Sequence, residues 1–367
     1  MKIRCSHVLI FSVGCLIILP HLISPLCGTN ADLVKKENRN LTPFPKEFQY
    51  KKISGQLEEY YNDRIPFRYR LLPFSRDISR RFFPEHSDFA IVGRKGFLFY
   101  LSPKSRECPF LQYIGKYIDP ISYHDKRKIL EYFQKAQKHS EKNNARFLAV
   151  IAPNKIEIYP DMLPEKRMFR QQGFLVEEIV RMAQESRPQV NLLYLKPALL
   201  EYRKKMSCPL YFAQDTHWNY AGAYCALKAI LEKLNAPWPA SWPLPEKALP
   251  DLSQNRLNHN DLLSRAPDSV PMIAEPDCRI SIPHVDFCDF PDVFVTENPH
   301  AFDQREVLVF RDSFFLALFP YFSAYFRKVH YYRGEYNADI VEKVKPQLVI
   351  FERISRVVPF FYRRKIR

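Results

Sequence analysis

The sequence predicts an α/β fold in which a mostly parallel central sheet is covered by helices on both faces. The chain has 367 residues, 46% of them hydrophobic, which is enough for one large core. Short apolar runs alternate along it with stretches of helical periodicity. Because strands that alternate with helices are joined by crossover connections, they lie parallel in the sheet.

The alternation begins after residue 86 and continues almost to the end of the chain. Two short β-like runs flank Gly93 and Gly96, which indicates a hairpin over 87–100. Apolar spacing of the helical kind defines the expected helices, 124–144, 173–186, 219–234 and 313–326, the last interrupted at Pro320. Continuous apolar runs define the expected strands, 146–153, 191–196, 306–310, 328–332 and 347–351.

The remaining segments are more polar or richer in proline and divide the chain into parts. An arm that packs on the main domain is expected between the leader and the hairpin, and a proline-rich excursion is expected inside the main domain. The parts are a leader at 1–27, the arm at 28–85, the main domain at 86–360 with its excursion at 236–300, and a basic tail at 361–367.

The first residues have the features of an export signal. Lys2 and Arg4 precede an apolar run from Val8 to Leu19, which stops at Pro20. That run is shorter than the about 20 residues that a membrane-spanning helix needs. The segment predicts either a secretory signal or a short membrane anchor that is not cleaved, and in both cases an exported protein.

The cysteines fit an exported protein and give no sign of a metal site. None of them forms a C-x-x-C pair, so neither a zinc site nor a thioredoxin-like motif is predicted. Cys278 and Cys288 lie in one polar segment and are equally compatible with a disulfide or with two free thiols. Five cysteines follow the leader, so at least one is unpaired or pairs outside the chain.

The net charge of +15 does not predict a nucleic-acid partner. The basic residues are scattered, and no zinc-finger spacing, RNA-recognition signature or helix-turn-helix pattern is present. An anionic polysaccharide or a membrane surface would suit the charge, and a solvated basic face is the commoner explanation.

A serine, a histidine and an aspartate occupy positions from which they can act together. Ser313 follows the strand at 306–310 and begins a helix, and ligands bind at this end of the strands in parallel sheets. Asp215 and His217 are two residues apart, so on an extended segment they share a face. A histidine oriented by a carboxylate activates a serine hydroxyl, and the unpaired amides of Ser313 and its neighbours at the helix start can face an oxyanion.

Each of these residues also has a structural explanation. Asp215 can cap the helix that follows, His217 can be a satisfied interior polar group, and Ser313 can be an N-cap. Spacing alone does not decide between the two interpretations.

Several motifs occur in an order that resembles a known family. They are ENRNLTPFP at 37–45, YYNDRIPFR at 60–68, VGRKGFLFY at 92–100, APNKIEIYPDMLP at 152–164, DTHWNYAGA at 215–223, FRDSF at 310–314 and KPQLVIFERISR at 345–356. Together they resemble the alginate O-acetyltransferase family of the AlgX/AlgJ type. The resemblance implies an SGNH-hydrolase-like three-layer sandwich with a mostly parallel central sheet, preceded by the N-terminal arm.

The same resemblance assigns roles to residues. It implies that Ser313 carries the acyl group, that His217 is the general base and acid, and that Asp215 orients His217. Four further residues fall inside matching segments and are substrate-binding candidates, namely Lys155, Tyr159, Arg311 and Arg353. A structural ion pair is the more common role for such basic residues.

Two departures from the usual SGNH pattern concern the oxyanion site. Arg311 stands where glycine often precedes the Asp-Ser pair, and Phe315 stands where a small residue is expected. The usual glycine and asparagine donors have no clear counterparts, and Asn154 is a weak candidate beside a role in its own loop.

The implied function is a polysaccharide O-acetyltransferase of the cell envelope. The family needs no metal or dissociable cofactor at the site, its acceptor is an exported polysaccharide, and its acetyl donor is a membrane-bound acyltransferase, with an inner-membrane tether as an option. Two alternatives stay open at this point. One is a carbohydrate acetylesterase with the same triad, and the other is a non-catalytic glycan-binding or scaffold subunit of an export complex.

Overall fold

The fold is that of a computed structural model, which describes Phe44, Tyr60, residues 90–100, 121–163, 175–245 and 292–364, and Ile366. The chain divides into two compact units, Met1–His86 and Ser87–Arg367. All the helices and strands discussed below belong to the second unit. The predicted leader and the pair Cys278 and Cys288 lie outside the described residues.

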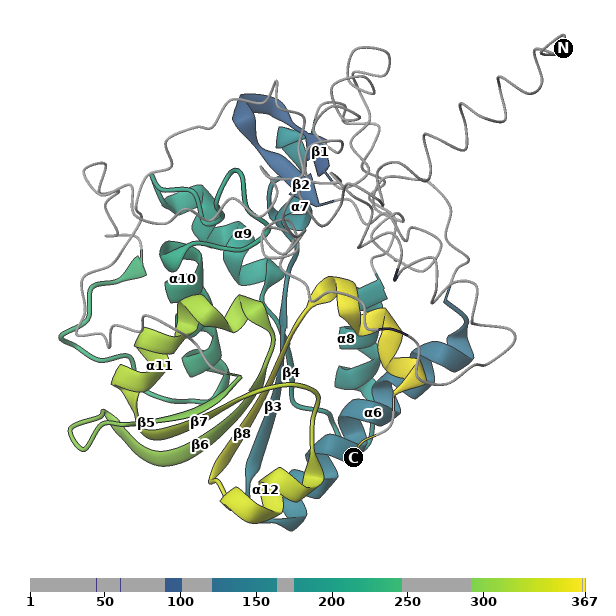
Figure 1. The fold of residues 1–367 in the computed structure, drawn as a ribbon, viewed down its shortest axis with the longest axis vertical. Coiled ribbons are helices and arrows are strands. Elements are labelled where there is room, and N and C mark those ends of the chain that lie inside the picture. Colours follow the sequence, from purple (N-terminus) through teal and green to yellow (C-terminus); the bar gives the residue numbers. More distant parts are fainter. Residues whose placement is uncertain are drawn as a thin grey trace, which may run out of the picture. The chain divides into compact units, whose positions relative to one another are not determined.

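A six-stranded, mostly parallel sheet forms the centre of the second unit, which confirms the predicted fold class (Figure 1). The strand order is β4-β3-β8-β6-β7-β5, and only β5 pairs antiparallel. The strands are β3 (Arg146–Ala152), β4 (Leu192–Tyr194), β5 (Val293–Glu297), β6 (Asp303–Arg311), β7 (Phe326–Arg333) and β8 (Leu348–Ile354).

Helices cover both faces of this sheet, so the unit has three layers (Figure 1). One face packs against α9 (Lys196–Lys205), α10 (Tyr220–Lys233) and α11 (Phe319–Tyr325). The other packs against α6 (Tyr123–Lys142), α8 (Leu175–Glu185), α12 (Ala338–Val344) and the 3₁₀ helix η8 (Ser355–Arg363). Alternate residues of β3 point to opposite faces, as the period of two in a strand requires.

A two-stranded hairpin, β1 (Ala90–Val92) and β2 (Leu98–Tyr100), forms where the glycines predict it. Lys95 and Gly96 adopt left-handed backbone conformations in its turn, with φ of 54° and 77°. The amide of Leu98 donates to the carbonyl of Ala213 at 2.8 Å. The hairpin is therefore bound to the segment that carries Asp215 and His217.

Some expected elements differ from those observed. The helix expected at 313–326 is two helices, η7 (Ser313–Leu318) and α11, and Pro320 lies in the first turn of α11 because a proline needs no hydrogen bond there. The excursion predicted at 236–300 contains the edge strand β5. Helix η8 runs to Arg363 and buries Phe361, so it extends into the predicted basic tail.

Helix α9 and the helix α12 between β7 and β8 had no counterpart among the expected elements. Both are short, and α12 has only one fully buried residue, Val341, so the apolar periodicity that reveals longer helices is weak there.

Two cysteines lie in the described part of the chain. Cys208 is disulfide-bonded, and its partner lies outside the described residues. Cys225 is a free, fully buried thiol in α10. No helix among the described residues has the length and apolar character that crossing a bilayer requires.

Candidate active site

The site forms where β6 ends and a loop precedes α10. Ser313 is the first residue of η7, two positions beyond the end of β6. Asp215 and His217 lie in the loop before α10, and an isolated β-bridge between Tyr211 and Trp218 closes that loop. The site thus lies at the carboxyl end of the parallel strands, where ligands of such sheets bind.

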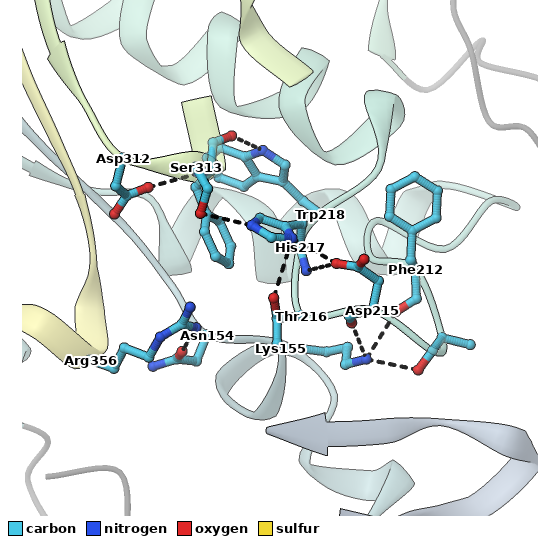
Figure 2. A network of polar contacts seen from close by, with 12 residues as sticks. Asn154, Lys155, Phe212, Asp215, Thr216, His217, Trp218, Asp312, Ser313 and Arg356 are labelled. Atoms are coloured by element: carbon cyan, nitrogen blue, oxygen red, sulfur yellow. Dashed lines mark hydrogen bonds and ion pairs between the residues drawn. The ribbon is translucent and has the colours of Figure 1, made fainter. Parts of the chain in front are cut away.

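Ser313, His217 and Asp215 form one continuous chain of hydrogen bonds (Figure 2). The Nε2 atom of His217 lies 2.9 Å from the Ser313 hydroxyl, and its Nδ1 atom lies 2.7 Å from Oδ1 of Asp215. The same Oδ1 accepts the backbone amide of His217 at 2.8 Å. The carboxylate therefore reaches the ring nitrogen that faces away from the serine, which two-residue spacing by itself does not guarantee.

Helix capping was the structural explanation for Asp215 and Ser313, but other residues cap the two helices. The side chain of Asn219 accepts the amide of Gly222 at 3.0 Å and caps α10. Asp312 accepts the amide of Phe314 at 2.7 Å and caps η7. Neither Asp215 nor Ser313 is the cap of its helix.

The turn that carries Ser313 is fixed from both sides. The loop between Tyr211 and Trp218 carries His217 and is called the histidine loop below. The indole nitrogen of Trp218 donates to the carbonyl of Phe314 at 2.7 Å, which ties this loop to η7. The second carboxylate oxygen of Asp312 accepts the amide of Ile354 at 2.8 Å, which ties η7 to β8. The amide of Phe314 is thus occupied by Asp312, so the expectation that several free amides surround Ser313 is wrong for this neighbour. The amide of Ser313, first in its helix, has no intrahelical acceptor.

A buried acidic side chain lies behind this turn. Glu352 is completely buried in β8, and its Oε2 accepts the amide of Asp312 at 3.1 Å. Burial, together with the nearby charge of Asp312, raises the pKa of Glu352 well above its ordinary value. Glu352 is therefore favoured in its protonated form.

Lys155 lies beside the histidine loop and donates its ammonium protons to backbone carbonyls of the loop. The residue is 4% exposed, and its ammonium donates to the carbonyls of Phe212, Ala213 and Asp215 at 3.0, 2.8 and 2.6 Å (Figure 2). An ammonium has three protons, so these carbonyls use all of them. These contacts hold the loop that carries Asp215, and substrate binding by Lys155 stays a prediction.

The other three substrate-binding candidates are also part of the interior. The hydroxyl of Tyr159 accepts the amide of Leu210 at 2.8 Å, and burial raises the pKa of this tyrosine. Arg353 donates to the carbonyls of Glu352 and Gly334. Arg311 is 2% exposed and lies over the ring of Phe319, 5.0 Å from its centroid. Burial lowers the pKa of both arginines, and none of the three side chains lines the cleft described next.

A small cleft opens beside the histidine loop. It is lined by Phe99, Tyr100, Asn154, Lys155, Ile156, Thr216 and Arg356. Thr216 connects the cleft to the site, since its hydroxyl lies 3.2 Å from Nδ1 of His217. Asn154, the weak oxyanion candidate, begins α7 (Lys155–Ile158) in a capping box with Glu157, and its amide nitrogen donates to the Ser355 hydroxyl at 2.7 Å.

Arg356 is a basic residue of this cleft that the sequence-based prediction missed. It lies two residues past the end of β8, as Ser313 lies two residues past the end of β6. That shared position at the carboxyl ends of adjacent strands is the signal by which it could have been found. Among the described residues no cluster of histidine, cysteine and acidic side chains could hold a metal ion.

Comparison with known proteins supports the predicted family resemblance. Residues 118–271 match a family model described as the SGNH hydrolase-like domain of the acetyltransferase AlgX, which confirms the resemblance and the SGNH-like fold. The matched stretch contains Asp215 and His217, whereas Ser313 lies beyond it. No curated protein sequence matches the chain.

Several solved structures resemble the chain at low identity. Bacillus cereus PatB1 is 14% identical, with a TM-score of 0.47, over 65% of this chain and 92% of that one. The O-acetyltransferase domain of Pseudomonas putida AlgJ is 14% identical, with a TM-score of 0.44, over 74% and 92%. Pseudomonas aeruginosa AlgX is 13% identical, with a TM-score of 0.43, over 74% and 65%.

Proposed function

We propose that the chain is a polysaccharide O-acetyltransferase of the cell envelope that works through an acetyl-Ser313 intermediate. The observation that carries the proposal is the unbroken hydrogen-bonded chain from Asp215 through His217 to Ser313. The match of residues 118–271 to an acetyltransferase domain supports acetyl transfer as the reaction.

The geometry supports two successive acyl transfers. In the first, Nε2 of His217 takes the proton of the Ser313 hydroxyl while Oγ attacks the acetyl carbonyl of the donor. Collapse of the tetrahedral intermediate expels the leaving group of the donor, which recovers that proton from His217. In the second, His217 takes a proton from a sugar hydroxyl that attacks the acetyl-serine, and it returns the proton to Oγ. Asp215 stabilises the imidazolium in both steps.

The wider setting of the reaction rests on the family resemblance. We propose an exported, periplasmic protein whose acceptor is an extracellular or periplasmic glycan and whose acetyl groups come through a membrane-bound acyltransferase. An alginate-like polysaccharide is the acceptor that the resemblance of the sequence motifs implies. The leader at 1–27, either as a cleaved signal or as an inner-membrane tether, would deliver the chain to that compartment.

One feature of the site favours a second candidate function, acetyl ester hydrolysis. The side chain of His217 is 22% exposed, so water can approach the base that would activate it. A carbohydrate acetylesterase would use the same three residues and differ only in the attacking hydroxyl. Comparing hydrolysis with transfer to an oligosaccharide distinguishes the two.

The first test is the intact mass of the purified protein after incubation with p-nitrophenyl acetate. We expect one acetyl adduct in the wild type, none with Ser313→Ala, and much slower formation with His217→Ala, because an unassisted serine hydroxyl is a weak nucleophile. Ser241→Ala is the matched control, since Ser241 is an exposed serine of the same unit. Folded protein that forms no adduct and turns over no ester would contradict the proposal and favour the non-catalytic scaffold.

A further inference from the structure

The cleft beside the histidine loop contains the guanidinium of Arg356, most of whose N–H donors make no hydrogen bond to the described residues. Nη1 of Arg356 donates to Oδ1 of Asn154 at 3.0 Å. In the part of the chain that the structure describes, no other hydrogen bond and no ion pair of this guanidinium is formed. A guanidinium has five N–H donors, so most of those of Arg356 can serve a ligand.

The fold places the turn that carries Arg356 next to the turn that carries the nucleophile. Strands β6 and β8 are adjacent and parallel, with Phe310 paired to Phe351. Neighbouring strands lie about 4.8 Å apart, so the turns that follow them lie side by side. The hydrogen bond from the amide of Ile354 to Asp312, the residue before Ser313, joins those two turns directly.

Three neighbours fix the direction of the guanidinium, and Figure 2 shows one of them, Asn154, beside Arg356. Asn154 holds one edge, and the rings of Tyr100 and Phe314 lie 5.2 and 5.5 Å from the guanidinium carbon. Phe314 also contacts His217, with ring centroids 4.8 Å apart. Arg356 and the catalytic histidine therefore pack against the same aromatic ring.

The negative charge that forms on the acetyl oxygen during attack by Ser313 needs more hydrogen-bond donors than the neighbouring amides provide. Attack on an acetyl carbonyl places a negative charge on its oxygen, which preorganised donors stabilise. The amide of Ser313 is one such donor, but that of Phe314 is bound to Asp312. The protons of Lys155, the other cation of the cleft, are bound to carbonyls.

We propose that Arg356, oriented by Asn154, stabilises the oxyanion of the tetrahedral intermediate at Ser313. The inference rests on the proposed acyl transfer and extends it, because it supplies the electrophilic group that the sequence pattern lacks. Arg356 is then a catalytic residue that contacts the reacting carbonyl oxygen, and Asn154 is a positioning residue. The substrate of this step is an uncharged acetyl ester, whose oxygen becomes negative only as Oγ bonds to its carbon.

The test isolates the first half-reaction. The rate of acetyl-Ser313 formation from p-nitrophenyl acetate is measured by intact mass at timed intervals, over a range of ester concentrations. We expect Arg356→Gln to lower the maximal rate by about 10²–10³-fold, with little change in the concentration that gives half-maximal rate, because the charge is absent from the bound ester. Arg356→Lys should retain part of the rate. Arg363→Gln, which removes an exposed arginine from the same helix η8, is the matched control and should leave the rate unchanged.

A rescue experiment distinguishes loss of the guanidinium group from a disturbance of the local structure by a neutral residue at position 356. Added guanidinium salt, at concentrations that do not unfold the protein, should restore part of the rate to Arg356→Ala but should have no effect on Ser313→Ala. Absence of rescue in a folded Arg356→Ala variant that is slow would mean that the loss is structural, and it would overturn the inference.

Two other outcomes would also overturn it, and each differs from a failure of the proposed function. If Arg356→Gln acetylates Ser313 at the wild-type rate but transfers acetyl more slowly to an acidic oligosaccharide, Arg356 binds the acceptor instead. If both transfers are unchanged, Arg356 has no part in the reaction. In either case the wild type still forms the acetyl-serine, whereas failure of the proposed function would abolish the adduct in the wild type itself.

Discussion

Two basic side chains of one cleft differ in what their protons contact. Lys155 gives its three protons to the carbonyls of Phe212, Ala213 and Asp215, whereas Arg356 makes one hydrogen bond to the described residues, to Asn154. The first side chain therefore stabilises a loop, and the second is available to a substrate. Both lie in motifs that carry the family resemblance, at 152–164 and 345–356, so resemblance alone does not separate the two roles.

The role of Lys155 can be tested by removing its charge. Lys155→Met keeps most of the side-chain volume and leaves three buried carbonyls without their donor. We expect the free energy of unfolding to fall by about 2–4 kcal/mol and Ser313 acetylation to slow, because the loop that carries Asp215 and His217 is no longer held. Urea denaturation measures the loss of stability.

The matched control is Lys205→Met. Lys205 is half exposed and pairs with Glu201 one turn away on α9, so its loss should change the free energy of unfolding by less than about 0.5 kcal/mol. Equal effects of the two substitutions would contradict the positioning role.

At the scale of the elements, the start of α10 determines where the histidine loop lies. Asn219 caps the helix through the amide of Gly222, and its amide nitrogen donates to the carbonyl of Pro209 at 2.6 Å. The helix therefore packs closely against the segment that leads into the loop. Gly222 permits this approach, since a Cβ atom there would lie 2.2 Å from the carbonyl oxygen of Leu210.

Replacing Gly222 by alanine should lower the stability of the protein, whereas the same replacement inside a helix usually raises it. Gly→Ala in a helix interior normally stabilises by about 1 kcal/mol. For Gly222→Ala we expect destabilisation of about 1–3 kcal/mol, because the backbone of Leu210 has to move. Thermal unfolding measures it. Gly334→Ala is the control, since its added Cβ would first meet the side chain of Tyr332, which can shift. A stabilised Gly222→Ala variant would show that the two segments are not in close contact.

At the scale of the whole molecule, ionisable groups buried in the central sheet make stability depend on pH. Glu352 is fully buried in β8, and its pKa is raised by burial and by the charge of Asp312. Above the ordinary glutamate pKa of 4.5 the unfolded chain releases this proton while the folded chain keeps it. The folded state then binds more protons than the unfolded state, so the contribution of Glu352 to stability declines as pH rises.

Glu352→Gln should remove this decline, because glutamine does not titrate. We expect the free energy of unfolding of the wild type to fall, relative to that of the variant, as pH rises from about 5 to about 8. Denaturation curves at several pH values provide the measurement. Glu232→Gln, at a largely exposed position on α10, should run parallel to the wild type. Parallel curves for Glu352→Gln as well would mean that Glu352 is already ionised in the folded protein.

The sequence by itself determined the alternation of strands and helices and the hairpin at Gly93 and Gly96, and it predicted that Asp215, His217 and Ser313 can act together. These features have local causes. Apolar periodicity, turn residues and a polar residue just past a buried strand are visible within a few positions of the chain. Edge strand β5 and the short helices α9 and α12 were missed, because few of their residues are buried and the periodicity is faint.

Only the tertiary structure decided which side chains meet. His217 and Ser313 are 96 residues apart in the chain, and the fold brings their side chains to 2.9 Å because β6 and the loop before α10 end at the same edge of the sheet. The same folding buries Tyr159, Arg311 and Arg353 and leaves Arg356 facing the cleft. The sequence does not distinguish a charged residue that is buried from one that faces a cleft, because its surroundings are formed by segments that are distant in the chain.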